Sequence, residues 1–205
     1  MKFKKPMLLY DMSNYVKEFE EIFTSKIKRE GSDKLLDYLK SADFFTAPAS
    51  TRFHGNYAGG LVEHTVKVYR RFLKLAEAEF GKEYLEREGE SLAIIALLHD
   101  ICKVNYYKVE QRNVKVDGQW VQKPYFTTDD QLPYGHGEKS VYMISGFLRL
   151  TREEAMAINW HMGAFDDRAR GTTGTINRAF NMYPISLIFH VADMMTSYLD
   201  EETRT

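Results

Sequence analysis

Apolar side chains recur every three to four residues through most of this chain, which is the spacing of amphipathic helices. The pattern predicts N-terminal helices within residues 12–40 and a long helix over residues 61–80. Helical spacing returns over residues 138–162, and Pro184 can occupy the first turn of a last helix that reaches Leu199. The chain is therefore predicted to be mainly α-helical.

The most apolar segment, residues 92–98, reads Leu-Ala-Ile-Ile-Ala-Leu-Leu and is apolar on nearly every side. It predicts a buried central helix, with Ser91 as its N-terminal cap and an end near Lys103. This apolar run leads directly into His99-Asp100. It is far shorter than the roughly 20 residues needed to cross a bilayer, so no membrane partner is expected.

The pattern changes to β-strand character in the middle of the chain. Two runs rich in β-branched and aromatic residues flank Asp117-Gly118, a strong two-residue turn signal. We expect an inserted β-hairpin at about residues 106–128, with Pro124 disrupting its second strand. Residues 163–183 are mostly polar and predict a long loop.

Composition narrows the classes of function. A length of 205 residues without a linker-like stretch predicts one domain over residues 1–205. The net charge of −1 lacks the broad positive character of a protein whose main task is to grip nucleic acid. The single cysteine, Cys102, is expected to be a small buried side chain, and no signal peptide is visible, so a cytoplasmic location is expected.

Six residues suited to metal binding are spread along the chain: His64, His99, Asp100, His136, His161 and Asp193. Divalent transition metals favour imidazole nitrogens and carboxylate oxygens. Neighbours on a helix point about 100° apart, so His99 and Asp100 can converge on one metal only near a helix end, where the sequence places them. Asp193 lies among apolar residues, where a carboxylate is costly to bury unless it is paired or metal-bound. From the residues alone, two interpretations are equally supported: these side chains form a metal site, or they are unrelated polar residues.

The order of these residues resembles the HD-domain superfamily of metal-dependent phosphohydrolases, over about residues 59–200. The sequence segments that resemble this superfamily are GGLVEHTVKV, LLHDICKV, GHGEKSV, NWHMG and HVADMMTSYLDE. It is strongest to the HD domain of YhaM-type bacterial 3'-to-5' exoribonucleases and to small phage-associated proteins. The resemblance implies an all-α, phosphodiesterase-like helical bundle, with the small β-hairpin as an insertion.

The resemblance also implies a centre with two divalent transition metal ions. One ion would be held by the HD pair and its two flanking partners, that is by His64, His99, Asp100 and Asp193. The second would be held by His136 and His161, with Asp100 bridging both ions. Manganese, iron, nickel, cobalt and zinc fit such ligands, and magnesium is a further candidate. Met162 stands where some two-metal relatives have a second histidine, so the second ion is expected to bind more weakly.

The implied reaction is hydrolysis of a phosphoester or phosphodiester by a metal-activated water. Asp100 and Lys103 are the expected catalytic residues, since Lys103 follows in the HDxxK order and can stabilise phosphoryl charge or protonate a leaving oxygen. The expected partner is a small phosphorylated substrate, above all a nucleotide, with short nucleic acid as an alternative. Further candidates for substrate contact are Arg52, Arg168, Arg170 and the hairpin residue Trp120. Ordinary surface or packing roles remain open for each of these.

Two other functions stay open. A minority of two-metal HD proteins use a diiron pair to activate oxygen, and a non-catalytic nucleotide- or nucleic-acid-binding protein is the other alternative. The complete ligand set favours the hydrolase over the binding protein. His190 shares a helical face with Asp193 and is expected to support the site or the core, whereas His54 has no assigned role.

Overall fold

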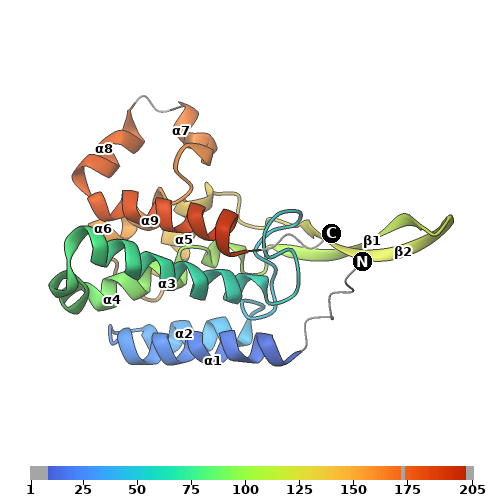
Figure 1. Cartoon of the computed structure of the whole chain (residues 1–205), viewed down its shortest axis with the longest axis horizontal. Coiled ribbons are helices and arrows are strands. Elements are labelled where there is room, and N and C mark those ends of the chain that lie inside the picture. The colour runs from blue at the N-terminus through green and yellow to red at the C-terminus, as the bar shows by residue number, and fades with distance from the viewer. Residues whose placement is uncertain (1–8, 172–173, 202–205) are drawn as a thin grey trace.

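The computed structural model describes residues 9–171 and 174–201, most of which are helical (Figure 1). The N-terminal helices α1 (Leu9–Lys26) and α2 (Ser32–Ser41) lie side by side along one edge of the body. Next to them are α3 (Gly60–Phe80) and α4 (Lys82–Leu98), which are joined by Gly81 alone. Gly81 has a φ of 83°, a conformation that glycine adopts without a steric penalty.

The second half of the chain completes the helical body. Its helices are α5 (His136–Ser145), α6 (Arg152–Asn159), α7 (Asp167–Gly171), α8 (Thr175–Met182) and α9 (Pro184–Met195). The short 3₁₀ segment η1 (Ile101–Lys103) follows α4, and a second one, η2 (Gly163–Phe165), lies between α6 and α7. A π-helical turn, η3 (Thr196–Asp200), follows α9. α9 packs against α3, α6 and α8. Within the described ranges, none of the helices has both the length and the apolar character needed to cross a bilayer.

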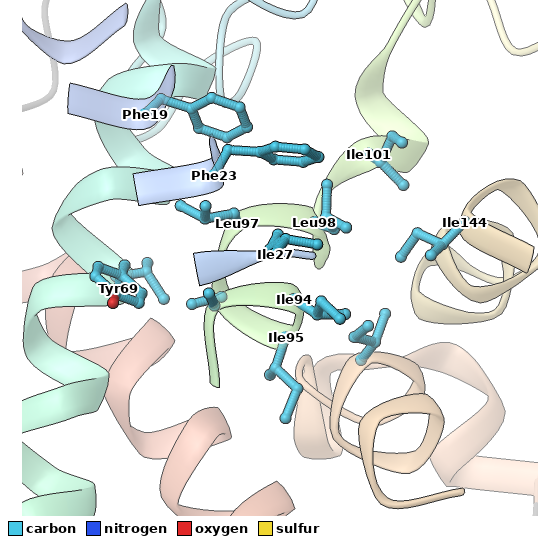
Figure 2. Packing of buried hydrophobic residues seen from close by; sticks show 14 of the residues in the cluster. Phe19, Phe23, Ile27, Tyr69, Ile94, Ile95, Leu97, Leu98, Ile101 and Ile144 are labelled. Atoms are coloured by element: carbon cyan, nitrogen blue, oxygen red, sulfur yellow. The ribbon is translucent and has the colours of Figure 1, made fainter. Parts of the chain in front are cut away.

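The core is built around α4. Every residue from Leu92 to Leu98 is at most 1% exposed, and the helix packs against α1, α3 and α6. Figure 2 shows Phe19 and Phe23 of α1 close to Leu97 and Leu98. Full burial of one leucine or isoleucine side chain contributes about 1.5–3 kcal/mol to the stability of the fold. The seven buried residues therefore hold the last two turns of α4 firmly in the core, next to the residues that follow Leu98. The predicted buried central helix is confirmed.

The beginning of α4 differs from the prediction. The helix starts at Lys82, not at Ser91, because the mostly polar residues before the apolar run form its first turns, nearly three of them at about 3.6 residues per turn. Ser91 is therefore an interior residue, and its hydroxyl donates to Glu154 Oε1 over 2.7 Å. The helix also ends earlier than expected, at Leu98, and η1 follows it.

The predicted hairpin is confirmed, and it extends away from the helical body (Figure 1). Strand β1 (Tyr107–Val116) pairs antiparallel with β2 (Gln119–Thr128), and the two turn residues Asp117 and Gly118 have φ values of 49° and 84°. The expectation that Pro124 disrupts the second strand was wrong, since Pro124 lies opposite Gln111 in an unbroken register. Both strands of this two-stranded sheet are edge strands, so proline, which has no backbone N–H, can lie on the unpaired side without loss of a hydrogen bond between the strands.

The prediction of a long loop over residues 163–183 was also wrong. This region contains η2, α7 and α8, and α8 packs on α9 with Ala179 buried. α7 and α8 are only 5 and 8 residues long, so any helical period in the sequence extends over about two turns at most and is hard to distinguish from a loop.

Glu154 ties three segments of the fold together. Its buried carboxylate accepts hydrogen bonds from both terminal nitrogens of Arg29, at 2.7 and 2.9 Å, and from Ser91. It also accepts from the backbone N–H of Thr151 at 2.7 Å, which completes a capping box at the start of α6. Burial alone would raise the pKa of Glu154, but Arg29 and the other donors outweigh it and lower that pKa.

Replacing this carboxylate is expected to destabilise the protein. Glu154→Gln should lower the free energy of unfolding at pH 7 by about 3 kcal/mol, because it breaks a buried ion pair. The lowered pKa means that the carboxylate stabilises the fold above the ordinary value of 4.5 and that this contribution is lost as the pH falls below it. Urea unfolding at pH 7 and at acid pH should therefore show a gap between wild type and variant that narrows with acidity. Glu153→Gln is the matched control, and an equal loss in both variants would contradict the account.

Candidate metal centre

The HD pair lies where α4 ends. His99 keeps helical backbone angles, with φ −56° and ψ −34°, whereas Asp100 departs to φ −104° and ψ 16°. This change turns the two neighbouring side chains toward each other, and His99 Nε2 lies 3.5 Å from Asp100 Oδ2. Both side chains are buried, at 0% and 2% exposure. The predicted convergence at a helix end is therefore present in the structure.

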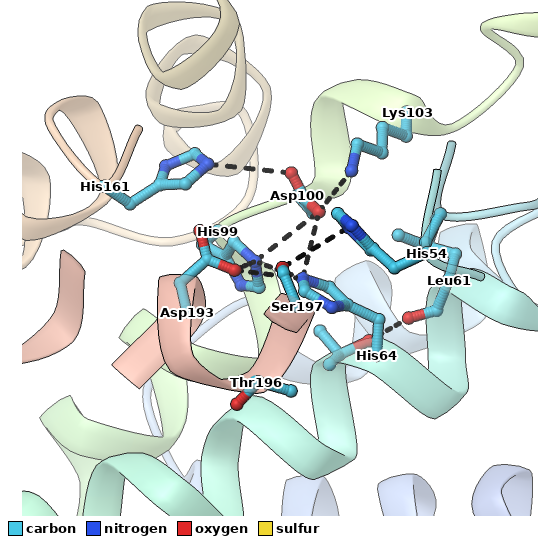
Figure 3. Close-up of polar contacts among 12 residues, drawn as sticks. His54, Leu61, His64, His99, Asp100, Lys103, His161, Asp193, Thr196 and Ser197 are labelled. Atoms are coloured by element: carbon cyan, nitrogen blue, oxygen red, sulfur yellow. Dashed lines mark hydrogen bonds and ion pairs between the residues drawn. The ribbon is translucent and has the colours of Figure 1, made fainter. Parts of the chain in front are cut away.

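Two further residues join this pair from separate helices (Figure 3). His64 of α3 places its Nε2 atom 3.3 Å from His99 Nε2 and 3.6 Å from Asp100 Oδ2. Asp193 of α9 places Oδ1 3.2 Å from His64 Nε2 and 4.0 Å from His99 Nε2. Ligand atoms at about 2.1 Å from one ion are themselves about 3.0–3.5 Å apart. These four residues, here called the first cluster, have nearly that spacing.

The other carboxylate oxygen of Asp100 faces a second pair of histidines, here called the second cluster. His136, the first residue of α5, places Nε2 2.7 Å from Asp100 Oδ1. His161, which follows α6, places Nε2 3.7 Å from the same oxygen. Asp100 thus presents Oδ2 to the first cluster and Oδ1 to the second. The structure brings together all six residues that the sequence predicted as metal ligands. Their ligand atoms lie close enough to hold an ion in three groups: His64 with His99 and Asp100, His161 with His99 and Asp193, and His136 with Asp100 and Cys102.

Backbone carbonyls orient two of these imidazoles. His99 Nδ1 lies 2.8 Å from the carbonyl of Ala96, and His161 Nδ1 lies 2.6 Å from the carbonyl of Ile158. A carbonyl only accepts, so each Nδ1 carries the hydrogen and each Nε2 offers a lone pair to the site. His190 Nδ1 donates to the carbonyl of His161 over 2.6 Å, in agreement with its expected supporting position.

The charges of the site suit a bound cation. Burial lowers the pKa of His99 and of His136, which favours the neutral form that binds metals. Burial opposes ionisation of Asp100, but Lys103 and the nearby imidazoles outweigh it, so the pKa of this carboxyl lies well below the usual range. Burial also disfavours charge on His64, yet Glu201 and Asp193 raise its pKa to about 10. The surroundings of His64 therefore stabilise positive charge at this position.

A cavity of about 710 Å³ opens over both clusters. Lys103 lines this cavity, and its Nζ atom lies 2.6 Å from Asp100 Oδ2. Burial alone would lower the pKa of Lys103, but the contact with Asp100 outweighs it and raises that pKa. Aromatic side chains from four parts of the chain form much of the remaining wall: Phe53, Tyr106, Tyr107, Phe165 and Tyr198. The cavity therefore combines polar groups that can carry chemistry with apolar surface that can hold a ring.

The predicted substrate contacts are less well placed than the predicted ligands. Arg52 is exposed and is not part of the cavity wall. Trp120 is 71% exposed, next to the hairpin turn, while only the hairpin base reaches the cavity. Arg168 is held by Asp166, at 2.7 Å. Arg170 belongs to α7, but its side chain lies outside the described residues.

Sequence reasoning missed three neighbours of the clusters. Glu201 Oε1 lies 3.0 Å from His64 Nδ1, and the ring of His54 stacks on that of His64 with centroids 5.1 Å apart. Cys102, expected to be a buried side chain, is buried, and its Sγ lies 3.4 Å from His136 Nδ1. Burial raises the pKa of the Cys102 thiol to about 12. Glu201 follows η3 with an extended backbone, φ −118° and ψ 149°, so no helical spacing from Asp193 signalled its position.

Comparison with known proteins identifies the family to which the segment around the clusters belongs. The family model described as HD domain matches residues 61–194. A dihydroneopterin 2',3'-cyclic phosphate phosphodiesterase from Methanocaldococcus jannaschii is 42% identical over 65 residues, which cover 31% of this chain and 26% of the relative. The match thus spans about a quarter of that protein's length, and no solved structure matches. The specific likeness to YhaM-type and phage-associated proteins stays a prediction. The chain belongs to the HD domain family.

Proposed function

We propose that this protein is a metal-dependent phosphohydrolase whose centre holds two divalent transition metal ions bridged by Asp100. The observation that carries the proposal is the division of Asp100 between the clusters, with Oδ1 2.7 Å from His136 Nε2 and Oδ2 3.5 Å from His99 Nε2. When bound, such ions lower the pKa of a coordinated water and polarise a phosphoryl oxygen. We place the HD core at about residues 59–200, within one domain.

The donor set supports manganese, iron, nickel, cobalt or zinc, since it combines imidazoles with carboxylates. The first cluster offers two imidazoles and two carboxylates, and the second offers His136 and His161 with the shared Asp100. Met162 also lines the cavity and supplies no ligand suited to a hard ion. The ion in the second cluster is accordingly the weaker of the two.

Lys103 is the proposed partner of the substrate phosphate. Its ammonium group lies beside Asp100 and is only 13% exposed, so its charge acts in a poorly solvated space. From this position it stabilises negative charge on the phosphoryl group and can donate a proton to the leaving oxygen. The raised pKa keeps this proton on the amine until charge develops on the leaving group.

The cavity wall supports a substrate with an aromatic ring, above all a nucleotide. Tyr106 and Tyr107 stand at the hairpin base, and Phe165 and Tyr198 approach from other segments of the wall. Aromatic faces of this kind stack on bases. The relative is a dihydroneopterin 2',3'-cyclic phosphate phosphodiesterase, which also agrees with hydrolysis of a phosphodiester. We therefore propose phosphodiester hydrolysis in a small nucleotide, with short nucleic acid as a second substrate form.

The test is a hydrolysis screen with controlled metal content. Purified protein loaded with Mn²⁺ should release product from bis(p-nitrophenyl) phosphate and from nucleoside 2',3'-cyclic phosphates. Removal of metal with a chelator should abolish the activity, and Mn²⁺ should restore it, because the attacking water depends on the ions. Fully loaded protein that is inert toward the whole panel would contradict the proposal. Oxygen uptake by the iron-loaded form would favour the diiron oxygenase in its place.

A further inference from the structure

His64 differs from the other imidazoles of the clusters in how its Nδ1 atom is held. His99 and His161 follow the last turns of α4 and α6, where backbone carbonyls are free to accept from Nδ1. His64 is the fifth residue of the long helix α3, where the carbonyls of the preceding turn already accept helical N–H groups. Its Nδ1 must therefore find a partner outside its own helix.

Glu201 supplies that partner. Its Oε1 atom lies 3.0 Å from His64 Nδ1, and its side chain is only 2% exposed. The residue before it fastens this part of the chain to α3, since Arg71 donates to both carboxylate oxygens of Asp200 at 2.7 and 2.6 Å. Lys67 also donates to the backbone carbonyl of Asp200 at 3.0 Å. The position of Glu201 is thus fixed by residues one and two turns along α3 from His64.

The other face of His64 is covered by His54, whose ring is stacked at an interplanar angle of 28°. His54 Nε2 lies 4.0 Å from Glu201 Oε2, and that oxygen is buried without a hydrogen-bond partner among the described residues. Both His54 and Glu201 lie outside the 61–194 segment that matches the HD family. The support around His64 is therefore an addition of the flanking segments, and the family match does not account for it.

We propose that Glu201 is a positioning residue, which accepts the Nδ1–H of His64 and so directs Nε2 into the first cluster. A carboxylate in this role fixes the tautomer of the imidazole, fixes the ring orientation and increases its strength as a ligand. The inference rests on the proposed metal centre. In this role the Glu201 carboxylate acts only through its contact with His64, and it does not touch a metal or the substrate.

Calorimetric titration with Mn²⁺, together with metal counting at saturation, tests this role without an activity assay. Glu201→Gln should weaken the affinity for one ion by about 10–100-fold, with the same number of ions bound at saturation. Glu201→Ala should weaken it further, because the glutamine amide oxygen can still accept from Nδ1. Asp166→Asn is the matched control: it removes a buried carboxylate that pairs with Arg168 and does not anchor Glu201, and it should leave the affinity close to that of the wild type. Circular dichroism of the metal-free proteins checks folding.

Three outcomes would overturn the inference. Wild-type affinity in both Glu201 variants would mean that the contact with His64 has no effect on the site. An equal loss in Asp166→Asn would mean that the effect follows from removing any buried carboxylate near the site and not from the contact with His64. Loss of a whole ion at saturation in Glu201→Gln would make Glu201 a ligand itself. A wild-type protein that binds no Mn²⁺ would instead overturn the metal centre, which separates the failure of the two proposals.

Discussion

Replacing Asp100 with asparagine is expected to reduce hydrolysis by about 10³-fold or more, equivalent to at least about 4 kcal/mol of transition-state stabilisation. Four of the five other predicted ligands lie close to Asp100: His64 and His99 approach Oδ2, and His136 and His161 approach Oδ1. The Lys103 ammonium group also contacts Oδ2. The amide keeps the volume of the side chain but removes its charge and one of its two acceptor oxygens. Both ions should therefore be lost or greatly weakened, as measured by metal counting beside the hydrolysis rate.

Asp166→Asn is the control for removing a buried carboxylate. Asp166 is 5% exposed and pairs with Arg168, so its replacement should lower stability without changing the metal count. If Asp100→Asn retained both ions and most of its activity, the bridging role of Asp100 would be refuted. Loss of only one ion would place Asp100 in a single cluster.

Lys103 gives the second large effect, of a different kind. Lys103→Gln should lower kcat by about 10²–10³-fold, the cost of removing one positioned donor that stabilises charge in the transition state. Metal affinity should stay the same or increase, because Asp100 Oδ2 loses the ammonium group that lies 2.6 Å away and competes with an ion. Steady-state kinetics and titration with Mn²⁺, done on the same preparations, measure the two quantities.

The separation of these two quantities is the informative result for Lys103. Lys108→Gln is the matched control, since Lys108 is half-exposed at the hairpin base and pairs with Glu110. It should change neither kcat nor metal affinity. A fall in metal content in Lys103→Gln that accounts for the whole loss of activity would reduce Lys103 to a structural partner of Asp100.

The sequence predicted the part of the fold that depends on strong apolar patterning. The fully apolar run of residues 92–98 made α4 recognisable, and it placed His99 and Asp100 at a helix end. The order of the ligand residues resembled the HD family. The structure brings these residues together from within α3, α5 and α9 and from just past the ends of α4 and α6. Ser91 was misread because polar residues that begin a half-buried helix lack the apolar period on which such predictions depend.

The supporting contacts could not be predicted in the same way. Glu201 meets His64 across 137 positions of sequence, and Arg168 turns to Asp166 and Asn159, so both depend on how the helices pack. An arginine in a polar loop gives no sign of whether its charge is already paired. The hairpin itself was predictable, but its direction away from the helical body was not. Because of that direction only the hairpin base reaches the cavity, and Trp120 lies at the other end, next to the turn.

The central claim is that one carboxylate joins two metal ions, and anomalous diffraction from crystals grown with Mn²⁺ tests it most directly. The account predicts two anomalous peaks, one among His64, His99 and Asp193 beside Asp100 Oδ2, and a weaker one between His136 and His161 beside Oδ1. A single peak, or two peaks that do not share Asp100, would contradict it.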